Sequence, residues 1–201
     1  MDQRTARSER SRDRLIQAAS EALVAGDGNF ELQQVAQLAG VSVGLPYHRF
    51  GSKAGLVAAV VDRFYDEVRV VISLSDVTER DWARREQIRL SRLIGFLYAN
   101  PLARIIISAL SREPEVAAVE SARWGELITL TASNIRKGQQ RGQLPQHYDA
   151  DTLSALICGG VRHAVGQALA ASARPDQNAL TGQIWTWISS GLALPAPASK
   201  S

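Results

Sequence analysis

The stretch "GVSVGLPYHRFGSK", residues 40–53, places a proline inside what otherwise has the pattern of a short helix. Another short helix is predicted just before it, over about 32–39, and Gly40 supplies the positive φ that a sharp turn needs. Ser42 is expected to cap the second helix, which would end near Phe50. Two short helices joined by a tight turn are typical of a helix-turn-helix.

Pro46 lies close enough to the start of the second helix to be tolerated, because only the first hydrogen bond within the helix is forfeited. The uncovered half of this helix carries Val43, Gly44, Leu45, Tyr47 and His48. A DNA major groove admits such a helix, and its first residues reach the base edges. Alternatively, these residues fill a surface corner of a helical bundle, and the pattern alone leaves both interpretations open.

Glycines and prolines divide the chain into about nine predicted helices, and no alternation typical of β-strands competes with them. The expected ranges are about 11–25, 32–39, 42–50, 52 to at least 68, 81–100, 101–110, 115–140, 149–173 and 178–192. Residues 1–10 are expected to form a flexible basic arm, and residues 195–201 a disordered tail. The predicted fold is therefore all-α: a three-helix unit, a bridging helix and a larger helical body.

Composition and cysteine usage exclude several classes of protein. Of the 201 residues, 45% are hydrophobic and 21% are charged, which is ordinary for a globular protein. No apolar run approaches the roughly 18 residues of a membrane span, and the first residues are too polar for a signal peptide. We therefore expect a cytoplasmic protein without a membrane partner. A single cysteine, Cys158, excludes an intrachain disulfide, and His48, His147 and His163 lie too far apart for metal-ligand spacing.

The segment "VAQLAGVSVGLPYHRFGSKAGLVAAVV", residues 35–61, resembles the DNA-binding signature of TetR-family transcriptional regulators. That signature has an Ala-Gly-Val-Ser turn, then Gly-x-x-Tyr-x-x-Phe, then Ser-Lys and an aliphatic fourth helix. The similarity extends back to "RDRLIQAASEAL", residues 12–23, and covers about the first quarter of the chain. The resemblance implies a DNA-binding domain over 1–52 and a ligand-binding and dimerisation domain over 53–194.

The resemblance also implies a set of DNA contacts, carried over position by position. Gln33 would approach DNA from the second helix, while Ser42, Val43, Gly44 and Leu45 would lie at the turn and face the base edges. Tyr47 would contact a phosphate or a thymine methyl, and His48 and Arg49 would flank the backbone. Lys53 would neutralise a phosphate, and Phe50 would be a core residue. These implied contacts are with double-stranded DNA that carries a palindromic operator.

Residues at three positions depart from the family pattern. Glu31 replaces the usual Thr or Ser cap of the second helix, which weakens that cap. Val43 and Leu45 replace more frequent polar residues, so readout must depend on methyl contacts, DNA shape or the arginine-rich first segment. That segment carries Arg4, Arg7, Arg10, Arg12 and Arg14. It would screen phosphates or form a solvated terminus, and charge alone does not decide between the two.

The last two predicted helices are candidates for a dimer seam. Gly159, Gly160 and Ala164 form a cluster of small residues, which usually permits close approach of another backbone. Ile184, Trp187 and Ile188 lie on one stripe of the last helix. Burial of both faces inside one subunit is the simpler alternative. The resemblance favours a homodimer in which both helices meet their copies around a two-fold axis.

A ligand site is expected among the helices of the body. Phe96, Trp124 and Ile128 lie where a bundle could enclose a cavity, although apolar residues at helical spacing also build an ordinary core. Arg104 follows Pro101 in an otherwise aliphatic run, and if buried it would need an anion or an internal carboxylate. His163 could reach a pocket or a partner. We therefore expect a small hydrophobic or aromatic effector, with an acidic group as one candidate partner of Arg104.

The favoured function is a homodimeric transcriptional regulator, a repressor that releases its operator when the effector binds. The alternative is a helical small-molecule-binding or enzymatic protein whose first fifty residues are only a bundle corner. No nucleophile motif, phosphate loop or metal cluster supports an enzyme, and no cofactor is expected. Cys158 lies among aliphatic residues, which favours a small buried hydrophobe over a nucleophile or a redox sensor.

Overall fold

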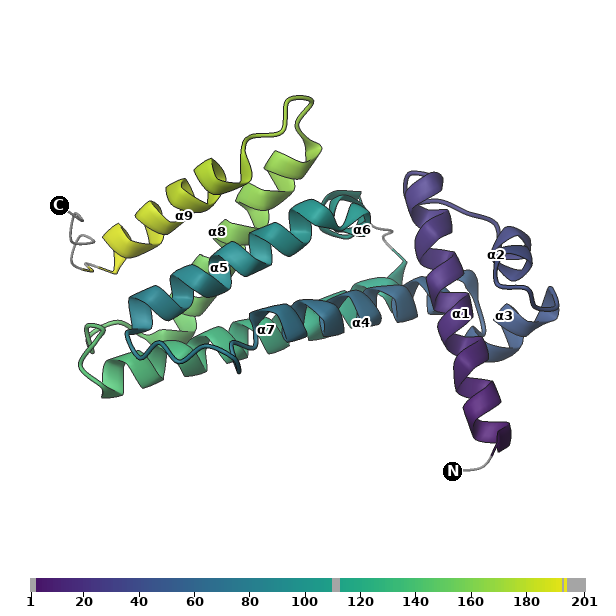
Figure 1. Cartoon of the computed structure of the whole chain (residues 1–201), viewed down its shortest axis with the longest axis horizontal. Coiled ribbons are helices and arrows are strands. Elements are labelled where there is room, and N and C mark those ends of the chain that lie inside the picture. The colour runs from purple at the N-terminus through teal and green to yellow at the C-terminus, as the bar shows by residue number, and fades with distance from the viewer. Residues whose placement is uncertain (1–2, 110–112, 193, 195–201) are drawn as a thin grey trace. The chain divides into compact units, whose positions relative to one another are not determined.

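The computed structural model describes residues 3–109, 113–192 and 194, and every regular element among them is a helix. This confirms the all-α prediction (Figure 1). The elements are α1 (Gln3–Ala25), α2 (Leu32–Leu38), α3 (Gly44–Phe50), α4 (Lys53–Ile72), α5 (Trp82–Ala99), α6 (Pro101–Arg104), the π-helical turn η1 (Ile105–Ala109), α7 (Pro114–Gln140), α8 (Ala150–Ala170) and α9 (Gln177–Gly191). In this part of the chain, no single helix is both long and apolar enough to cross a bilayer.

The chain forms two compact units. The first comprises Met1–Glu67 and Asn100–Arg123, and the second comprises Val68–Ala99 and Trp124–Ser201. Both α4 and α7 begin in the first unit and continue into the second. The functional division at residues 52 and 53 stays a prediction, because compactness does not test which residues bind DNA.

The first unit contains the helix-turn-helix. In Figure 1, α2 lies beside α1, and α3 follows α2 through a tight turn. The side chains of Leu15, Ala19, Val35 and Leu56, from α1, α2 and α4, are fully buried. The two from α1 recur four residues apart, as an amphipathic helix requires for one buried face. This core holds α2 and α3 at the surface of the unit.

The second unit is a helical bundle in which α9 packs along α5 and against α8 (Figure 1). Ile94, Ile135 and Val165, from α5, α7 and α8, are fully buried. The end of α5 is fastened to the connection between α8 and α9, because the Tyr98 hydroxyl donates a hydrogen bond of 3.2 Å to the Pro175 carbonyl. The described helices of this unit therefore enclose a common core.

Two expected boundaries are wrong. The first helix begins at Gln3 rather than near Ser11, so residues 3–10 are helical and do not form a flexible arm. This segment contains no glycine or proline, and its Arg, Ala, Glu and Gln residues are good helix formers. The helix expected over 101–110 is divided into α6 and a π-helical turn of mainly β-branched residues. The expected disordered tail, 195–201, lies outside the described residues.

Candidate nucleic-acid interface and ligand cavity

The turn between α2 and α3 has the geometry that its sequence predicts. Gly40 has a φ of +64°, and a methyl group in place of its hydrogen would meet no atom within 4 Å. Glycine is thus needed there for its backbone conformation and not for space. The amide of Val41 donates a hydrogen bond of 3.0 Å to the carbonyl of Ala36, which closes the end of α2. Ala36 is fully buried where the two helices approach.

The start of α3 differs from the expectation that Ser42 is its cap. Val43 occupies the cap position with a helical φ of −58°, and no side chain caps the helix. The carbonyl of Ser42 instead accepts a hydrogen bond of 3.0 Å from the amide of Leu45. Pro46 is the third residue of α3 and is buried. At this position the amide of an ordinary residue has no partner inside the helix, so proline costs little.

One face of α3 is uncovered. The side chains of Val43 and Tyr47 are 48% and 56% exposed, and Gly44, His48 and Arg49 are exposed as well. Val43 and Tyr47 lie four residues apart and so share a face. Gln33 is exposed on α2, and Leu45 is half-buried. The structure thus places all of these predicted DNA contacts except Leu45 at the open surface of the first unit.

The start of α4 is tightly bound to its surroundings. Ser52 caps this helix, because its hydroxyl oxygen accepts a hydrogen bond of 2.8 Å from the amide of Gly55. The ammonium group of Lys53 donates a hydrogen bond of 2.6 Å to the side-chain oxygen of Asn29 and lies 5.0 Å from the centre of the Phe30 ring. These contacts hold the ammonium group at one place, and its three N–H donors are more than Asn29 alone uses.

Arg12 makes a contact that the sequence pattern did not indicate. Its guanidinium group lies 5.9 Å from the centre of the Phe50 ring, which is half-buried and not a full core residue as expected. A cation over an aromatic face is attracted by the ring. Arg12 is exposed, so a basic group of α1 lies beside the end of α3. In the sequence, the one signal for Arg12 was its position in an arginine-rich segment.

A cavity of about 110 Å³ lies inside the second unit. Its walls are mainly aliphatic and aromatic. The apolar lining residues are Val68, Ile72, Trp82, Leu90, Leu93, Trp124, Leu127, Ile135, Ile157, Val161, Trp185 and Ile188. Four other lining residues are polar or ionisable, namely Glu86, Arg89, Thr131 and Cys158. An apolar wall with a few polar groups is the usual character of a site for a small molecule.

The polar groups of the cavity are paired with one another. The Arg89 guanidinium group contacts the Glu86 carboxylate at 3.0 Å through Nε and at 3.3 Å through Nη2, and it also donates to the carbonyl of Ile72. Both side chains of the pair are 15% exposed. Cys158 Sγ lies 3.4 Å from Thr131 Oγ1. Burial raises the pKa of the Cys158 thiol, an effect that the Thr131 hydroxyl opposes, so the thiol stays protonated near neutral pH.

Residues 15–60 match the model of a family described as bacterial regulatory proteins, tetR family. The matched segment is a DNA-binding domain of that family. Its members regulate transcription, and the matched residues contain the helix-turn-helix described above. This chain is accordingly a DNA-binding transcriptional regulator. No curated protein matches it in sequence.

Solved structures of TetR-family regulators share the fold over nearly the whole chain. One from Mesorhizobium loti is 24% identical, covers 93% of this chain and 97% of its own, and has a TM-score of 0.76. One from Syntrophomonas wolfei is 13% identical, with coverages of 96% and 100% and a TM-score of 0.79. The regulator FadR from Bacillus subtilis, solved in complex with stearoyl-CoA, is 15% identical, with coverages of 89% and 97% and a TM-score of 0.77.

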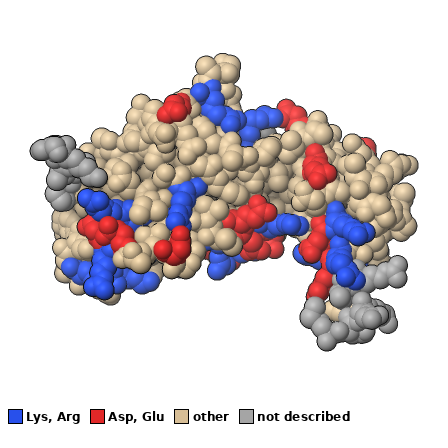
Figure 2. Space-filling model, in the orientation of Figure 1, with Lys and Arg blue, Asp and Glu red and all other residues tan. Residues whose placement is uncertain are grey.

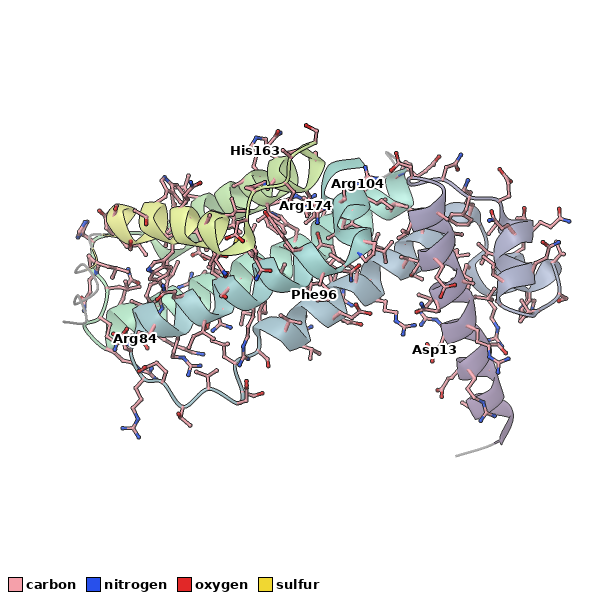
Figure 3. The ribbon with its side chains drawn as sticks, turned by 45° about the horizontal axis from the view of Figure 1, so that its top comes forward. Asp13, Arg84, Phe96, Arg104, His163 and Arg174 are labelled. Atoms are coloured by element: carbon pink, nitrogen blue, oxygen red, sulfur yellow. The ribbon has the colours of Figure 1, made fainter. Side chains whose placement is uncertain are left out.

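Only one of the ligand residues expected from the sequence pattern lines the cavity. Trp124 does so, and its ring also lies 4.9 Å from the guanidinium carbon of Arg162. Phe96 and Ile128 are half-buried but are not among the lining residues. His163 is exposed on α8 and also lies outside the lining (Figure 3). Helical spacing alone could not show which side of each helix faces the cavity.

Arg104 does not meet the condition on which its expected role in ligand binding depended, namely burial. Its side chain, on α6 of the first unit, is 42% exposed and forms an ion pair with Asp27, which is 72% exposed (Figure 3). Arg104 therefore has a local partner at the surface. It does not need the carboxylate of a ligand to balance its charge. An arginine of the second unit that is largely covered is Arg89, whose side chain is 15% exposed, and Glu86 is its carboxylate partner.

The expected dimer residues differ in exposure. Gly159 and Gly160 are exposed on α8, and Trp187 of α9 is 54% exposed. Ala164 is half-buried. Ile184 and Ile188 are buried inside the second unit, so they offer little surface to another chain. Sequence reasoning missed Leu156, which is 59% exposed on α8 and lines the same shallow hollow as Trp187.

Proposed function

We propose that this TetR-family chain is a homodimeric repressor that leaves a palindromic operator when a small hydrophobic or aromatic effector enters the cavity of the second unit. The observation that carries the DNA-binding part is the uncovered face of α3, where Val43 and Tyr47 are about half exposed. On such a face the apolar side chains can contact base edges, and the neighbouring basic ones can contact phosphates.

The residues of this face favour a particular kind of readout. Val43 can contact a thymine methyl, because such contacts are the main apolar interaction in the major groove. Tyr47 and Arg49 can donate hydrogen bonds to phosphates, which fix the register but carry no sequence information. Gly44 lets the helix backbone approach the bases closely, since no side chain intervenes. We propose an operator that is read at few base edges and largely through DNA shape.

The cavity supports an effector of apolar character. It is enclosed by aliphatic and aromatic side chains, and the Bacillus subtilis relative was solved with stearoyl-CoA, a ligand with a long apolar chain. α4 begins with Lys53, a proposed DNA contact, and carries Val68 and Ile72, which line the cavity. We propose that effector binding displaces α4 and changes the separation of the two recognition helices. Such coupling is typically worth about 1–3 kcal/mol.

A second copy of the chain is the proposed partner of α8 and α9. Leu156 and Trp187 are exposed and line one hollow, and Gly159 and Gly160 lie on the same helix as Leu156. Small residues beside large apolar ones permit close packing of helices from two chains. A two-fold symmetric dimer would place the recognition helices about one turn of DNA apart, roughly 34–36 Å.

Selection of bound sites from a random duplex library tests the proposed function. The full chain should select a palindromic consensus, and a titration of that duplex at two salt concentrations should show tight binding that weakens as salt rises. Binding without sequence preference would contradict it, since a helical protein that only binds small molecules would contact DNA through charge alone. The selected duplex also serves the variants described below.

A further inference from the structure

Residues 114–123 form the start of α7 and belong to the first unit, whereas the rest of that helix belongs to the second. This segment is anchored in the first unit by Val116, whose side chain is fully buried. α4 begins in the same unit with Lys53, one of the proposed DNA contacts. Contacts between the starts of these two helices therefore bear on the place where α4 would meet DNA.

One contact lies at the first turn of α4. The hydroxyl of Ser52, which caps this helix, donates a hydrogen bond of 3.2 Å to one carboxylate oxygen of Glu115. The two helices come close here, because a methyl group on Gly55 would lie 3.0 Å from the other oxygen of that carboxylate. A negative charge near the first turn of a helix is also stabilised by the helix dipole. Glu115 thus holds the turn that carries Lys53.

The second contact lies further along α4, where Arg123 meets two carboxylates. Its guanidinium group donates hydrogen bonds of 2.6 Å to Asp62 and of 2.9 Å to Asp66. The two aspartates lie four residues apart on α4, and like charges at that spacing repel each other. The Arg123 side chain is 15% exposed, whereas those of the aspartates are 44% and 59% exposed. Arg123 therefore offsets the repulsion and fastens α7 to α4.

The charged contacts of α4 differ in what they join. Figure 2 shows acidic and basic side chains next to one another where these helices run. Arg63 and Glu67 pair at 3.7 Å, but both belong to α4, so this pair joins nothing to the helix. Glu115 and Arg123 come from α7, so their contacts join two helices. Within the first unit, α4 can change its position only if it carries α7 with it or if these contacts break.

We infer that Glu115 and Arg123 are positioning residues for DNA binding, which hold residues 52–66 and so fix Lys53 where a phosphate meets it. This inference rests on the proposed function and adds to it two residues that themselves contact no DNA. A contact group that is already fixed loses less conformational freedom when it binds, which raises affinity. Binding without sequence preference depends on charge and gains little from such positioning.

The double variant Asp62→Ala with Asp66→Ala tests the inference, because charge and positioning predict opposite effects. The variant loses two negative charges, so by charge alone it should bind any duplex as tightly as the parent or more tightly. By loss of positioning, it should bind the selected duplex about three- to thirtyfold more weakly. Its affinity for a scrambled duplex of equal length should be unchanged or raised. A general loss of folding would instead lower both affinities alike, so titrations of both duplexes separate the two causes.

The matched control is Glu21→Ala with Glu67→Ala, which removes the same charge. Both carboxylates are exposed in the first unit, and each contacts a residue of its own helix, namely Gln17 and Arg63. This control should bind the selected duplex at least as tightly as the parent.

A double-mutant cycle tests whether Arg123 acts through the two aspartates. Arg123→Ala alone should weaken binding to the selected duplex, but in the aspartate variant it should add little further loss, because its partners on α4 are already gone. Fully additive losses would mean that Arg123 acts by its own charge, which would overturn its positioning role.

Glu115→Ala tests the first turn of α4 separately. It removes a negative charge beside Ser52, next to the proposed phosphate contact at Lys53, so by charge alone it should strengthen DNA binding. The inference predicts weaker binding to the selected duplex and an unchanged or raised affinity for the scrambled one.

The inference is overturned if the aspartate variant or Glu115→Ala binds the selected duplex as tightly as the parent, or if either loses affinity for both duplexes equally. Circular dichroism checks the fold. If the aspartate variant lacks the helical signal, Asp62→Asn with Asp66→Asn takes its place with the same expectation, since asparagine keeps the shape of the side chain. In each case, tight binding of the parent to the selected duplex would leave the proposed regulator standing. A parent that selects no duplex would remove the proposed function and this inference with it, so the two failures are distinguishable.

Discussion

The ammonium group of Lys53 donates a hydrogen bond to Asn29 and lies over the Phe30 ring, so it supports the local fold as well as the proposed DNA contact. A cation over an aromatic ring contributes about 0.5–1 kcal/mol at an exposed site. Tyr47 differs because its side chain is 56% exposed. The two residues that the sequence assigns to the same task thus have different structural roles.

Substitutions should separate these roles. Tyr47→Ala should weaken binding to the selected duplex and leave the thermal unfolding midpoint unchanged, because little of the side chain is packed. Lys53→Ala should weaken binding, flatten the dependence of log K on log salt by about one, and also lower the midpoint. Thermal melts and DNA titrations at several salt concentrations measure both effects.

Asn29→Ala is the control for Lys53. It removes the side-chain partner of the ammonium group and keeps the charge, so it should lower the unfolding midpoint and leave the salt slope intact. If Tyr47→Ala and Lys53→Ala both bound DNA like the parent, the proposed docking of α3 would be wrong.

Cys158 should react slowly with alkylating reagents. Burial raises the pKa of its thiol, and the thiolate is the reactive form. Because it is the only cysteine, total incorporation of iodoacetamide reports on this residue alone. Labelling of the native protein at pH 7 should be much slower than labelling of the urea-unfolded chain. Equal rates would show that the thiol is open to solvent and that the cavity wall is misassigned.

The raised pKa also predicts how stability changes in alkali. The folded thiol keeps its proton to higher pH than the unfolded thiol, whose ordinary pKa is 9.0. The folded state therefore binds more protons above that pH, and the free energy of unfolding falls as the pH rises through this range. Cys158→Ala should reduce this decline. Urea titrations of both proteins between pH 7 and pH 10 would measure it.

At the scale of elements, Asp149 caps the first turn of α8 with a side chain that can also titrate. Its carboxylate accepts hydrogen bonds of 2.7 Å from both the amide and the hydroxyl of Thr152, and these bonds lower its pKa. Asp149→Ala should lower the unfolding midpoint near neutral pH, because the first turn of α8 loses its cap. The ordinary pKa of Asp149 is 3.8, and its contribution should be lost as the pH falls below that value.

Asp149→Asn separates the cap from the charge. Asparagine caps helices about as well as aspartate, but it does not titrate. This variant should keep most of the stability at neutral pH and lose the part of the acid dependence that arises from Asp149. Melts of the three proteins from pH 7 to pH 3 would decide, and an Ala variant as stable as the parent at neutral pH would contradict the role of the cap.

The elements themselves were largely predictable because local residues decide them. Gly40 is required by its positive φ, Ser52 caps α4, and Pro101 begins α6. The errors arose where the local signal was absent or ambiguous. Residues 3–10 have the composition of a helix but no apolar face, and Ser42 preceded a helix that starts two residues later. Such cases depend on backbone geometry that residue types alone do not specify.

The site was less predictable than the fold, because it depends on which residues meet from distant parts of the chain. The proposed DNA face of α3 follows from one short segment, and four of the five residues expected on its uncovered half are exposed, whereas Leu45 is half-buried. The cavity draws on α4, α5, α7, α8 and α9. Arg89 and Glu86 look like ordinary surface charges in the sequence, three residues apart on one helix, and only the packing of the unit buries them.

At the scale of the whole molecule, the two units are linked by continuous helices. α4 starts at a proposed DNA contact, Lys53, and ends at Ile72 in the cavity wall. A ligand can shift the equilibrium between two states only by its differential affinity for them. The proposed effector would therefore have to favour a form of the second unit in which α4 takes a different position. In the proposed dimer, such a shift would change the spacing between the two recognition helices and so the affinity for the operator.

The dimer itself is tested by Gly159→Arg. Gly159 is exposed on α8, and a side chain there would meet no atom of its own chain within 4 Å. Arginine is a better helix former than glycine by about 1 kcal/mol, so the monomer should be no less stable. Gly160 is less suitable, because a side chain at that position would approach the Trp187 ring at 3.2 Å. Gly125→Arg is the matched control, since Gly125 is equally exposed and open but lies on α7.

Gly159→Arg should sediment as a monomer, whereas the parent and Gly125→Arg should sediment as dimers. With two half-sites no longer engaged together, affinity for the full palindrome should fall by about 100-fold or more, while a single half-site should bind as weakly as it does in the parent. Thermal melts and circular dichroism confirm that the fold is kept. A Gly159→Arg protein that remained dimeric, or a monomer that bound the full palindrome tightly, would show that α8 does not form the seam. In that case, the exposed Leu156 and Trp187 would need another partner.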